Sequence, residues 1–180
     1  MEYLDRIQNK VWRRIYLVLI KIQRFLAITV CLIVPAIVVY QVILRYVLKA
    51  PLMGIEELLV FFIIWLYMLG GSVASEQRTH ISCGILTLYM KRPLTIKLFN
   101  VAKALFGCIC GGWLSYWAWW YFTYSLKLWK VSDILHIPMF FAESAIFVGF
   151  GLMLFFTFLE LIDEIRVLIS YLKNKEDANE

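Results

Sequence analysis

The sequence has little charge for its length. Only 17% of its 180 residues are Asp, Glu, Lys or Arg, whereas globular domains carry about 25%. Hydrophobic residues make up 62% of the chain, and its mean hydropathy is +0.76. A disordered chain needs the opposite composition, and a small soluble domain buries only about two-thirds of the surface that its chain exposes. The composition therefore excludes disorder, argues against a soluble enzyme and indicates an integral membrane protein.

The long apolar runs lack the alternation of polar and apolar residues that is typical of a membrane β-barrel. A spanning segment must then be helical, because lipid cannot satisfy free backbone groups. About 20 mostly apolar residues suffice for one span. We predict an all-α integral membrane protein, a single membrane domain over residues 1–180 with four helices in a bundle. The predicted transmembrane helices are residues 25–48, 56–76, 94–126 and 137–160.

We expect no cleavable signal sequence at the N-terminal segment, because the first apolar run is too long and no small-x-small site follows it. In residues 1–24, apolar side chains recur at three- and four-residue spacing, and basic residues fill much of the remainder. This pattern predicts an amphipathic helix on the cytoplasmic membrane surface. Residues 161–180 are expected to form a cytoplasmic tail.

Lysine and arginine are scarce in two of the connections between spans. Fourteen of the 18 basic residues lie in residues 1–24, in residues 76–103 and after Leu159. Only four lie in residues 45–57 and 127–136. By the positive-inside rule, both termini face the cytoplasm. Membrane orientation accounts for the net charge of +5 without a nucleic-acid partner.

Residues that carry catalysis or bind metals are also few. The two histidines, His80 and His136, are predicted on opposite sides of the membrane, and none of the four cysteines lies in a predicted periplasmic loop. Zinc-ligand spacing, a phosphate-binding loop and hydrolase motifs are absent. We predict no catalytic residue, no metal and no cofactor in this chain, and we do not expect it to be an enzyme.

Ionisable residues cluster at the predicted ends of the helices. Arg45 closes the first helix, whereas Glu56 and Glu57 open the second on the same side. These carboxylates either complement the helix N-terminus, or form an ion pair that fixes the first hairpin or contacts a partner. Glu143 interrupts the fourth apolar run. It either faces protein or water, or lies at interface depth if its helix starts near Ala142.

Small residues recur at four-residue spacing, as in Gly70 with Ala74, Gly71 with Ser75, and Gly107 with Gly111. Such faces let helix backbones approach closely. We expect most of them to pack within the four-helix domain, which leaves room for one face to serve another subunit. Five of the seven tryptophans gather near the predicted periplasmic end of the third helix, which is typical of an interfacial aromatic belt.

Five stretches occur in a characteristic order: VILRYV at 42–47, IEEL at 55–58, WLYMLGG at 65–71, RTHI at 78–81, and residues 132–138 followed by an apolar run with Gly149. Taken in order, they resemble the small membrane subunit of tripartite ATP-independent periplasmic (TRAP) transporters. Two positions depart from the family pattern, since Gly54 stands where a tryptophan is frequent and Gly84 where an aspartate is frequent.

The resemblance implies a scaffolding subunit of a three-component importer in a bacterial inner membrane. A periplasmic substrate-binding protein would capture a small organic acid, and a large membrane subunit would move it using a sodium gradient. Sodium coupling is thus expected in the large subunit. This chain would pack against that subunit in the bilayer and help to dock the binding protein. The candidate structural and interface residues are Arg45, Glu56, Glu57, Trp65, Gly70, Gly71, Arg78, His80 and Glu143.

Two other functions stay open from the sequence. One is a four-helix membrane thiol or quinone oxidoreductase, and replacement of all four cysteines would test its thiol form. The other is a self-sufficient homo-oligomeric transporter, which reconstitution without a partner would test.

Overall fold

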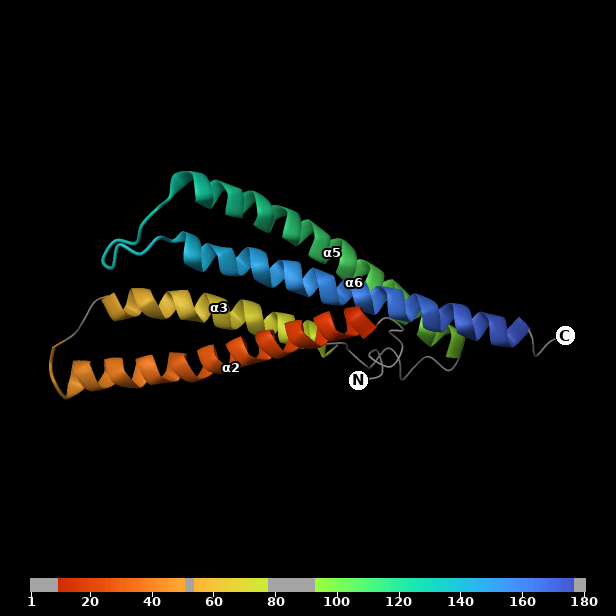
Figure 1. The fold of residues 1–180 in the computed structure, drawn as a ribbon, viewed down its shortest axis with the longest axis horizontal. Coiled ribbons are helices and arrows are strands. Elements are labelled where there is room, and N and C mark those ends of the chain that lie inside the picture. The colour runs from red at the N-terminus through yellow and green to blue at the C-terminus, as the bar shows by residue number, and fades with distance from the viewer. Residues whose placement is uncertain (1–9, 51–53, 78–92, 177–180) are drawn as a thin grey trace.

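The computed structural model describes residues 10–50, 54–77 and 93–176, and these residues form four long helices (Figure 1). All four are long and apolar enough to cross a membrane, so the predicted all-α class with four spanning helices is confirmed. Within the described residues, extended pairing is limited to one isolated bridge between Val131 and Pro138. The helices are α2 (Lys10–Tyr46), α3 (Gly54–Glu76), α5 (Pro93–Leu128) and α6 (Phe140–Glu176).

Three of the helices are longer than a bilayer requires. At about 1.5 Å per residue, α3 is about 34 Å long, close to the hydrocarbon thickness of about 30 Å. Helices α2, α5 and α6 have 37, 36 and 37 residues, so each is about 55 Å long. Figure 1 shows α5 and α6 continuing past α3 at the end where α2 begins.

Two boundaries drawn from the sequence do not interrupt the helices. The predicted amphipathic segment ends at residue 24, but helix α2 runs unbroken through this position into the first span. Residues 1–9 of the predicted segment lie outside the described residues. Helix α6 likewise continues through residue 160 into the predicted tail. No proline or glycine stands near either boundary, and so the backbone hydrogen bonds continue from one segment into the next.

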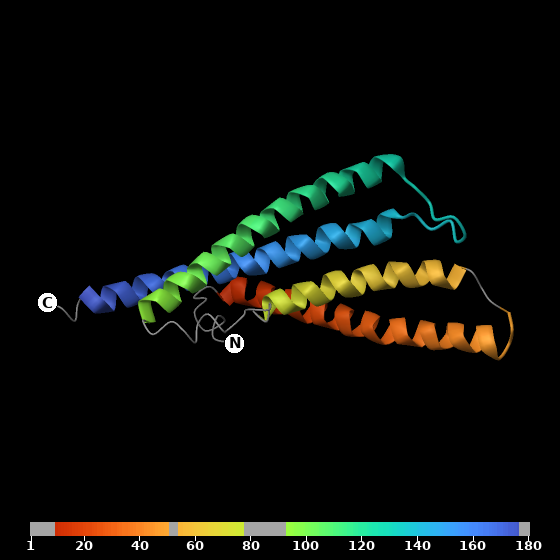
Figure 2. The same ribbon diagram turned by 180° about the vertical axis from the view of Figure 1, so that it is seen from behind.

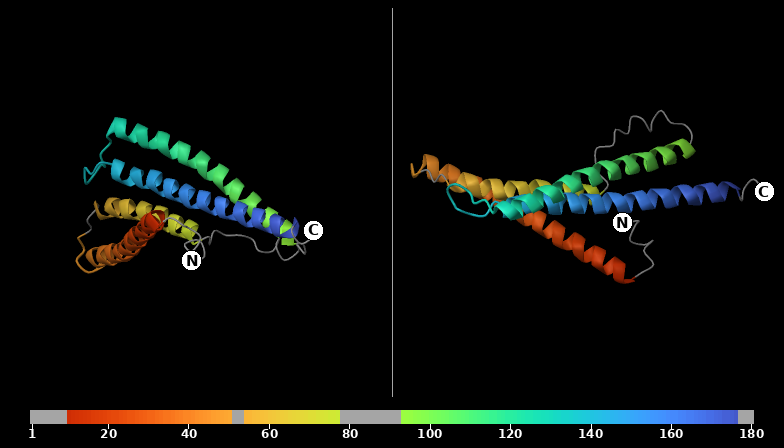
Figure 3. Two further views of the ribbon diagram at one scale, coloured as in Figure 1. Left: turned by 45° about the vertical axis from the view of Figure 1, so that its right-hand side comes forward. Right: turned by 90° about the horizontal axis from the view of Figure 1, so that it is seen from above.

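The four helices lie side by side in an open layer rather than in a closed bundle. Their order across the layer is α2, α3, α6, α5, and the rear view shows the same order (Figures 1 and 2). Seen from above, α2 leans away from the other three helices (Figure 3). Only 22% of the apolar span of α6 is buried, and 0% of the α2 span. Such a layer leaves broad apolar faces for lipid or protein.

Small side chains occupy many of the buried positions between helices, beside larger ones such as Phe61, Leu69 and Phe156. Small residues let backbones approach closely, which membrane helices need because lipid tails compete equally well for large apolar side chains. Large apolar side chains such as Phe25 and Phe106 point outward, each with 70% of its surface exposed. The buried small residues within the helices are Ser72, Ser75, Ala104, Ala118, Ser125, Ala142 and Ala145.

Glycines bring α3 and α6 together. A Cβ atom on Gly149 of α6 would lie 2.6 Å from the Met68 Cβ of α3. Gly71 of α3 packs in turn against the Met153 side chain of α6. A Cβ on the neighbouring Gly70 would meet no atom within 4 Å, so this glycine faces away from the seam.

The α5–α6 contact also contains glycines. A Cβ on Gly107 would lie 3.4 Å from the Thr157 methyl, and one on Gly111 would lie 3.5 Å from a Leu154 methyl. Both distances are ordinary van der Waals contacts. The G-x-x-x-G pair of the sequence therefore packs within this chain, as expected.

The Gly149 contact predicts a steric effect of a single methyl group. Gly149→Ala should lower the free energy of unfolding by about 1–3 kcal/mol, the usual cost of overpacking, because the Met68 Cβ is the rigid base of its side chain. Thermal denaturation in mild detergent measures the change. Gly151→Ala is the matched control, since a Cβ there meets nothing within 4 Å. Equal midpoints for the two variants would contradict the proposed close contact.

Candidate functional site

A group of polar contacts lies where α5 turns into α6. We call residues 129–139 the α5–α6 loop. Its ends are paired, since Ser132 N–H donates to the Ile137 carbonyl at 2.9 Å and Met139 N–H to the Lys130 carbonyl at 2.9 Å. Residue His136 has a positive φ of 52°, and its Nδ1 lies 3.2 Å from the Ser132 carbonyl oxygen. The loop therefore has a defined, hairpin-like path.

Glu57 in the first turn of α3 holds this loop. Its Oε1 accepts the Asp133 N–H at 3.0 Å, and its Oε2 accepts the N–H groups of Ile134 at 3.3 Å and Leu135 at 2.9 Å. Hydrogen bonds to a charged acceptor are about twice as strong as neutral ones. One carboxylate thus joins the start of α3 to a loop 76 or more residues later in the chain.

Gly54 makes room for the same loop. A Cβ on Gly54 would lie 3.0 Å from a Leu135 methyl carbon, so a larger residue would press on the side chain next to the bound backbone. This position is one of the two that depart from the resemblance described above. Here the absence of a side chain allows the loop to lie against α3.

Glu56 and Arg45 do not form the ion pair that the sequence allowed. Glu56 Oε1 accepts a hydrogen bond from Gln41 Nε2 at 3.0 Å, which joins α2 to α3. The Arg45 guanidinium lies 5.7 Å from the ring centroid of its neighbour Tyr46. Within the described ranges, no ion pair connects Arg45 to either glutamate. The two glutamates therefore act through hydrogen bonds, in the first turn of α3 where negative charge is favourable.

Trp65 links the middle of α3 to the beginning of α6. Its indole N–H donates to the Phe141 carbonyl at 3.0 Å. This contact was not predicted, because the two residues are 76 positions apart and no local pattern relates them. It fixes the level at which α6 starts against α3.

Glu143 lies in the first turn of α6, which begins at Phe140 and so agrees with the interface-depth interpretation. Its Oε1 accepts the Tyr121 hydroxyl at 2.8 Å, and its Oε2 accepts the Ser125 hydroxyl. Both donors are on α5. The carboxylate is satisfied by two hydroxyl groups and a helix N-terminus, which ties α5 to α6 beside the loop.

Aromatic side chains surround this end of α5. The ring centroids of Trp117 and Trp120 are 5.9 Å apart, and those of Trp120 and Tyr124, which stack, are 6.1 Å apart. Lys130 Nζ lies 5.9 Å from the Tyr124 ring centroid. Half-exposed aromatic rings with the Lys130 ammonium group beside them suit the boundary between lipid and water. The arrangement agrees with the predicted belt.

One ion pair was not predicted from the sequence, and two candidates fall outside the described residues. Arg24 of α2 forms an ion pair with Glu76 of α3 at 2.7 Å, at the opposite end of the layer from the α5–α6 loop. Arg78 and His80 lie outside the described residues. The described cysteines, Cys31, Cys108 and Cys110, are free thiols in α2 and α5, and no group of three possible metal ligands occurs in the part of the chain that the structure describes.

Comparison with known families gives one match. The family model described as tripartite ATP-independent periplasmic transporters, DctQ component, matches residues 34–167. The matched segment contains the Glu57 loop contact, the Trp65 contact and the Glu143 cluster. No curated protein matches the chain at a significant level.

The Glu57 geometry predicts which carboxylate orders the loop. Glu57→Gln replaces one acceptor oxygen by an NH₂ group, so the N–H groups of residues 133–135 lose charged acceptors worth about 1.5–3 kcal/mol each. Hydrogen–deuterium exchange should then be faster at these amides by at least tenfold. Glu56→Gln is the matched control and should leave their exchange unchanged. Unaltered protection in the Glu57 variant would show that the carboxylate does not hold the loop.

Proposed function

This chain belongs to the DctQ component family of tripartite ATP-independent periplasmic transporters, and on that premise we propose that it scaffolds the transporter. Family membership identifies it as a small membrane subunit of such a transporter. Its partners would be a large membrane subunit and a periplasmic substrate-binding protein. The assembled complex would import a small organic acid by sodium symport, with the ions and the substrate moving through the large subunit.

The open layer supports the scaffolding role. A chain that conducts its own substrate needs polar groups along a path through the membrane. The carboxylates described above instead sit at helix ends, with Glu56, Glu57 and Glu143 at the loop end and Glu76 at the other. The broad apolar faces of the layer offer contact area to a helical partner. A fixed layer against which the large subunit moves is the function that this geometry fits best.

The α5–α6 loop supports a docking role. Its apolar side chains are exposed, with Trp129 at 58%, Val131 at 51% and Ile134 at 54%. The Glu57 carboxylate holds the backbone of residues 133–135 in the same loop. A loop that is fixed on one side and exposed on the other suits a soluble partner that docks at the membrane surface.

Charge supports an orientation with both termini in the cytoplasm. Exposed basic residues, including Arg13, Arg14 and Lys21, lie near the N-terminal end of α2, away from the loop. Basic residues are retained on the cytoplasmic side of a membrane. The α5–α6 loop would accordingly face the periplasm of a bacterial inner membrane.

Affinity purification from native membranes tests the proposed assembly. A tagged chain extracted in mild detergent should recover a large polytopic membrane protein in near-equal amount, identified by mass spectrometry. Replacement of Cys31, Cys83, Cys108 and Cys110 by alanine should leave both recovery and substrate uptake unchanged. The scaffold proposal would be contradicted if this chain were recovered alone and gave flux after reconstitution without a partner. That result would support a self-sufficient transporter.

A further inference from the structure

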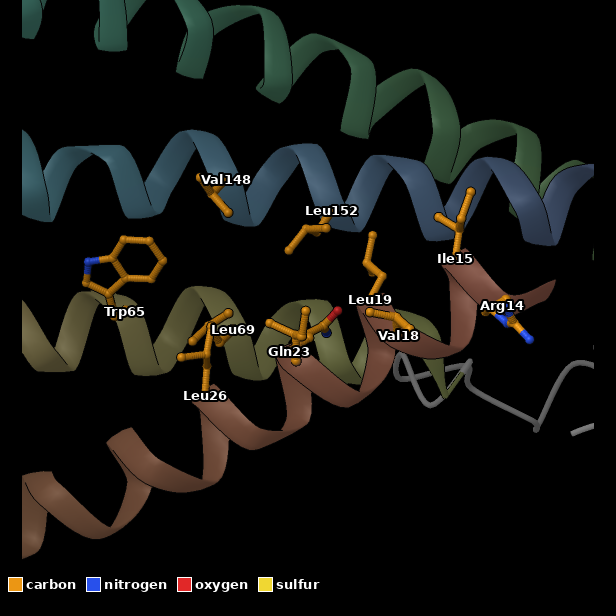
Figure 4. A pocket seen from close by; sticks show the side chains of 11 residues that line it. Arg14, Ile15, Val18, Leu19, Gln23, Leu26, Trp65, Leu69, Val148 and Leu152 are labelled. Carbon is orange, nitrogen blue, oxygen red and sulfur yellow. The ribbon is translucent and has the colours of Figure 1, made fainter. Parts of the chain in front are cut away.

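The end of α2 and the α5–α6 loop lie at the same end of the layer, which we call the loop end (Figure 1). Toward the other end, an open groove of about 640 Å³ lies between α2 and the pair α3 and α6 (Figure 4). This groove follows α2 from Leu26 back to Arg14, away from the loop. In the proposed orientation, a soluble periplasmic partner therefore meets the exposed side chains of the loop end instead.

Three residues of the loop end have a left-handed backbone conformation without being glycine. They are Lys49, Trp129 and His136, with φ of 50°, 44° and 52°. Elsewhere in the described residues, no non-glycine residue and no glycine has a positive φ. Glycine is the usual residue at such turns, because a Cβ atom disfavours them. Backbone strain of this kind gathers at functional sites, so these three side chains are candidates for a role beyond the fold.

Two of the three side chains have a partner within the chain. The Trp129 ring stacks on that of Phe140, with centroids 6.1 Å apart, and His136 Nδ1 lies near the Ser132 carbonyl oxygen. Lys49 is exposed, and its side chain has no such partner among the described residues. The turn at Lys49 lets the next N–H donate to a carbonyl of α2 at 3.1 Å. That bond needs the backbone conformation and not the lysine side chain.

Lys130 has the corresponding place at the other edge of the layer. Helices α2 and α5 are the outer helices, and each lysine follows the end of one of them. Both lysines are exposed, and neither forms an ion pair within the described ranges. Arg45 and Lys127 lie in the last turns of the same helices, where a cation complements the helix C-terminus. Lys49 and Lys130 lie past the helix ends and have no such role.

Three acidic side chains of the loop end are engaged within the chain. Glu57 accepts the loop amides, Glu143 accepts two hydroxyl groups, and Glu56 accepts the Gln41 amide. Asp133 is an exposed acidic residue of the loop itself. The outer edges of the loop end thus present positive charge, beside the exposed apolar side chains of the α5–α6 loop. A partner that is complementary to this surface carries acidic groups around an apolar area.

We propose that Lys49 and Lys130 bind acidic side chains on the soluble substrate-binding protein, while the apolar side chains of the α5–α6 loop contact the surface between those acids. This inference rests on the proposed function and adds the chemistry of the docking partner. Two lysines on opposite edges set the orientation of the docked protein, because a protein held at one edge alone is free to turn. Exposed complementary charges mainly speed association, and salt weakens their effect.

Association kinetics on the complete membrane complex test the proposal. The complex is reconstituted in phosphatidylcholine nanodiscs, immobilised, and exposed to the substrate-loaded binding protein of the same transporter at about 0.05 M and about 0.5 M salt. Lys49→Glu and Lys130→Glu should each slow association at the lower salt about fivefold, the upper range for one exposed ion pair. The difference from the wild type should shrink at the higher salt. Lys173→Glu is the matched control, because Lys173 is exposed on α6 at the opposite end of the layer.

Lys49→Gly separates docking from folding. Glycine adopts the left-handed conformation without strain, so the thermal midpoint of the chain in mild detergent should stay the same or rise. Association of the binding protein should nevertheless slow, because the ammonium group is gone. A lower midpoint with unchanged association would show that Lys49 supports the fold and would overturn its docking role.

The other outcomes distinguish this proposal from the function on which it rests. Equal association rates for the wild type and both charge-reversal variants would overturn the proposal and leave the scaffolding role intact. No binding to the wild-type complex at either salt would contradict docking by this subunit altogether. In nanodiscs that contain phosphatidylglycerol, native mass spectrometry counts the lipid retained by the complex. If charge reversal lowers that count but leaves association unchanged, the lysines hold lipid headgroups and the proposal is wrong.

Discussion

The seam between α3 and α6 holds the two helical hairpins of this chain together. Helix α2 packs on α3 and helix α5 packs on α6, so the close contact of α3 with α6 decides whether the four helices form one body. Gly149 lies against Met68 and Gly71 against Met153, with Ser72 and Ala145 fully buried beside them. Van der Waals contact is a main source of helix association in lipid. This attraction falls steeply as the distance between the backbones increases.

Polar contacts then align the two hairpins along the seam. Trp65 and Glu57 of α3 bond to the backbone of Phe141 and of the α5–α6 loop, at two levels separated by about two helical turns. Small-residue packing alone permits one helix to slide past the other, whereas these directional bonds fix the register. Glu143 does the same between α5 and α6. The result is a layer whose loop end is held by carboxylates and whose opposite end is joined by the Arg24–Glu76 ion pair.

The sequence was sufficient for the helices but not for their arrangement. Hydropathy predicts the number and position of the spans, because lipid excludes unpaired backbone, and the order of short motifs by itself indicates the DctQ component family. Periodicity could not distinguish an open layer from a closed bundle, since apolar faces toward lipid and toward protein look alike. It also could not pair Glu57 with residues 133–135 or Glu143 with Tyr121, because these contacts depend on the level at which distant helices start. Glu57 was identified as a candidate, whereas the loop amides, Tyr121 and Ser125 gave no local signal.

A scaffolding subunit requires the layer to be a fixed frame within the transporter. Double electron–electron resonance measures it most directly, with spin labels at exposed Val39 of α2 and exposed Trp113 of α5 in a chain whose native cysteines are replaced. The two sites lie on opposite edges of the layer, so their separation reports any relative motion of the hairpins. We expect one narrow distance distribution in the complete complex, unchanged when sodium and substrate-loaded binding protein are added. A distribution that shifts or divides on their addition would show that the layer itself moves and would contradict the scaffold.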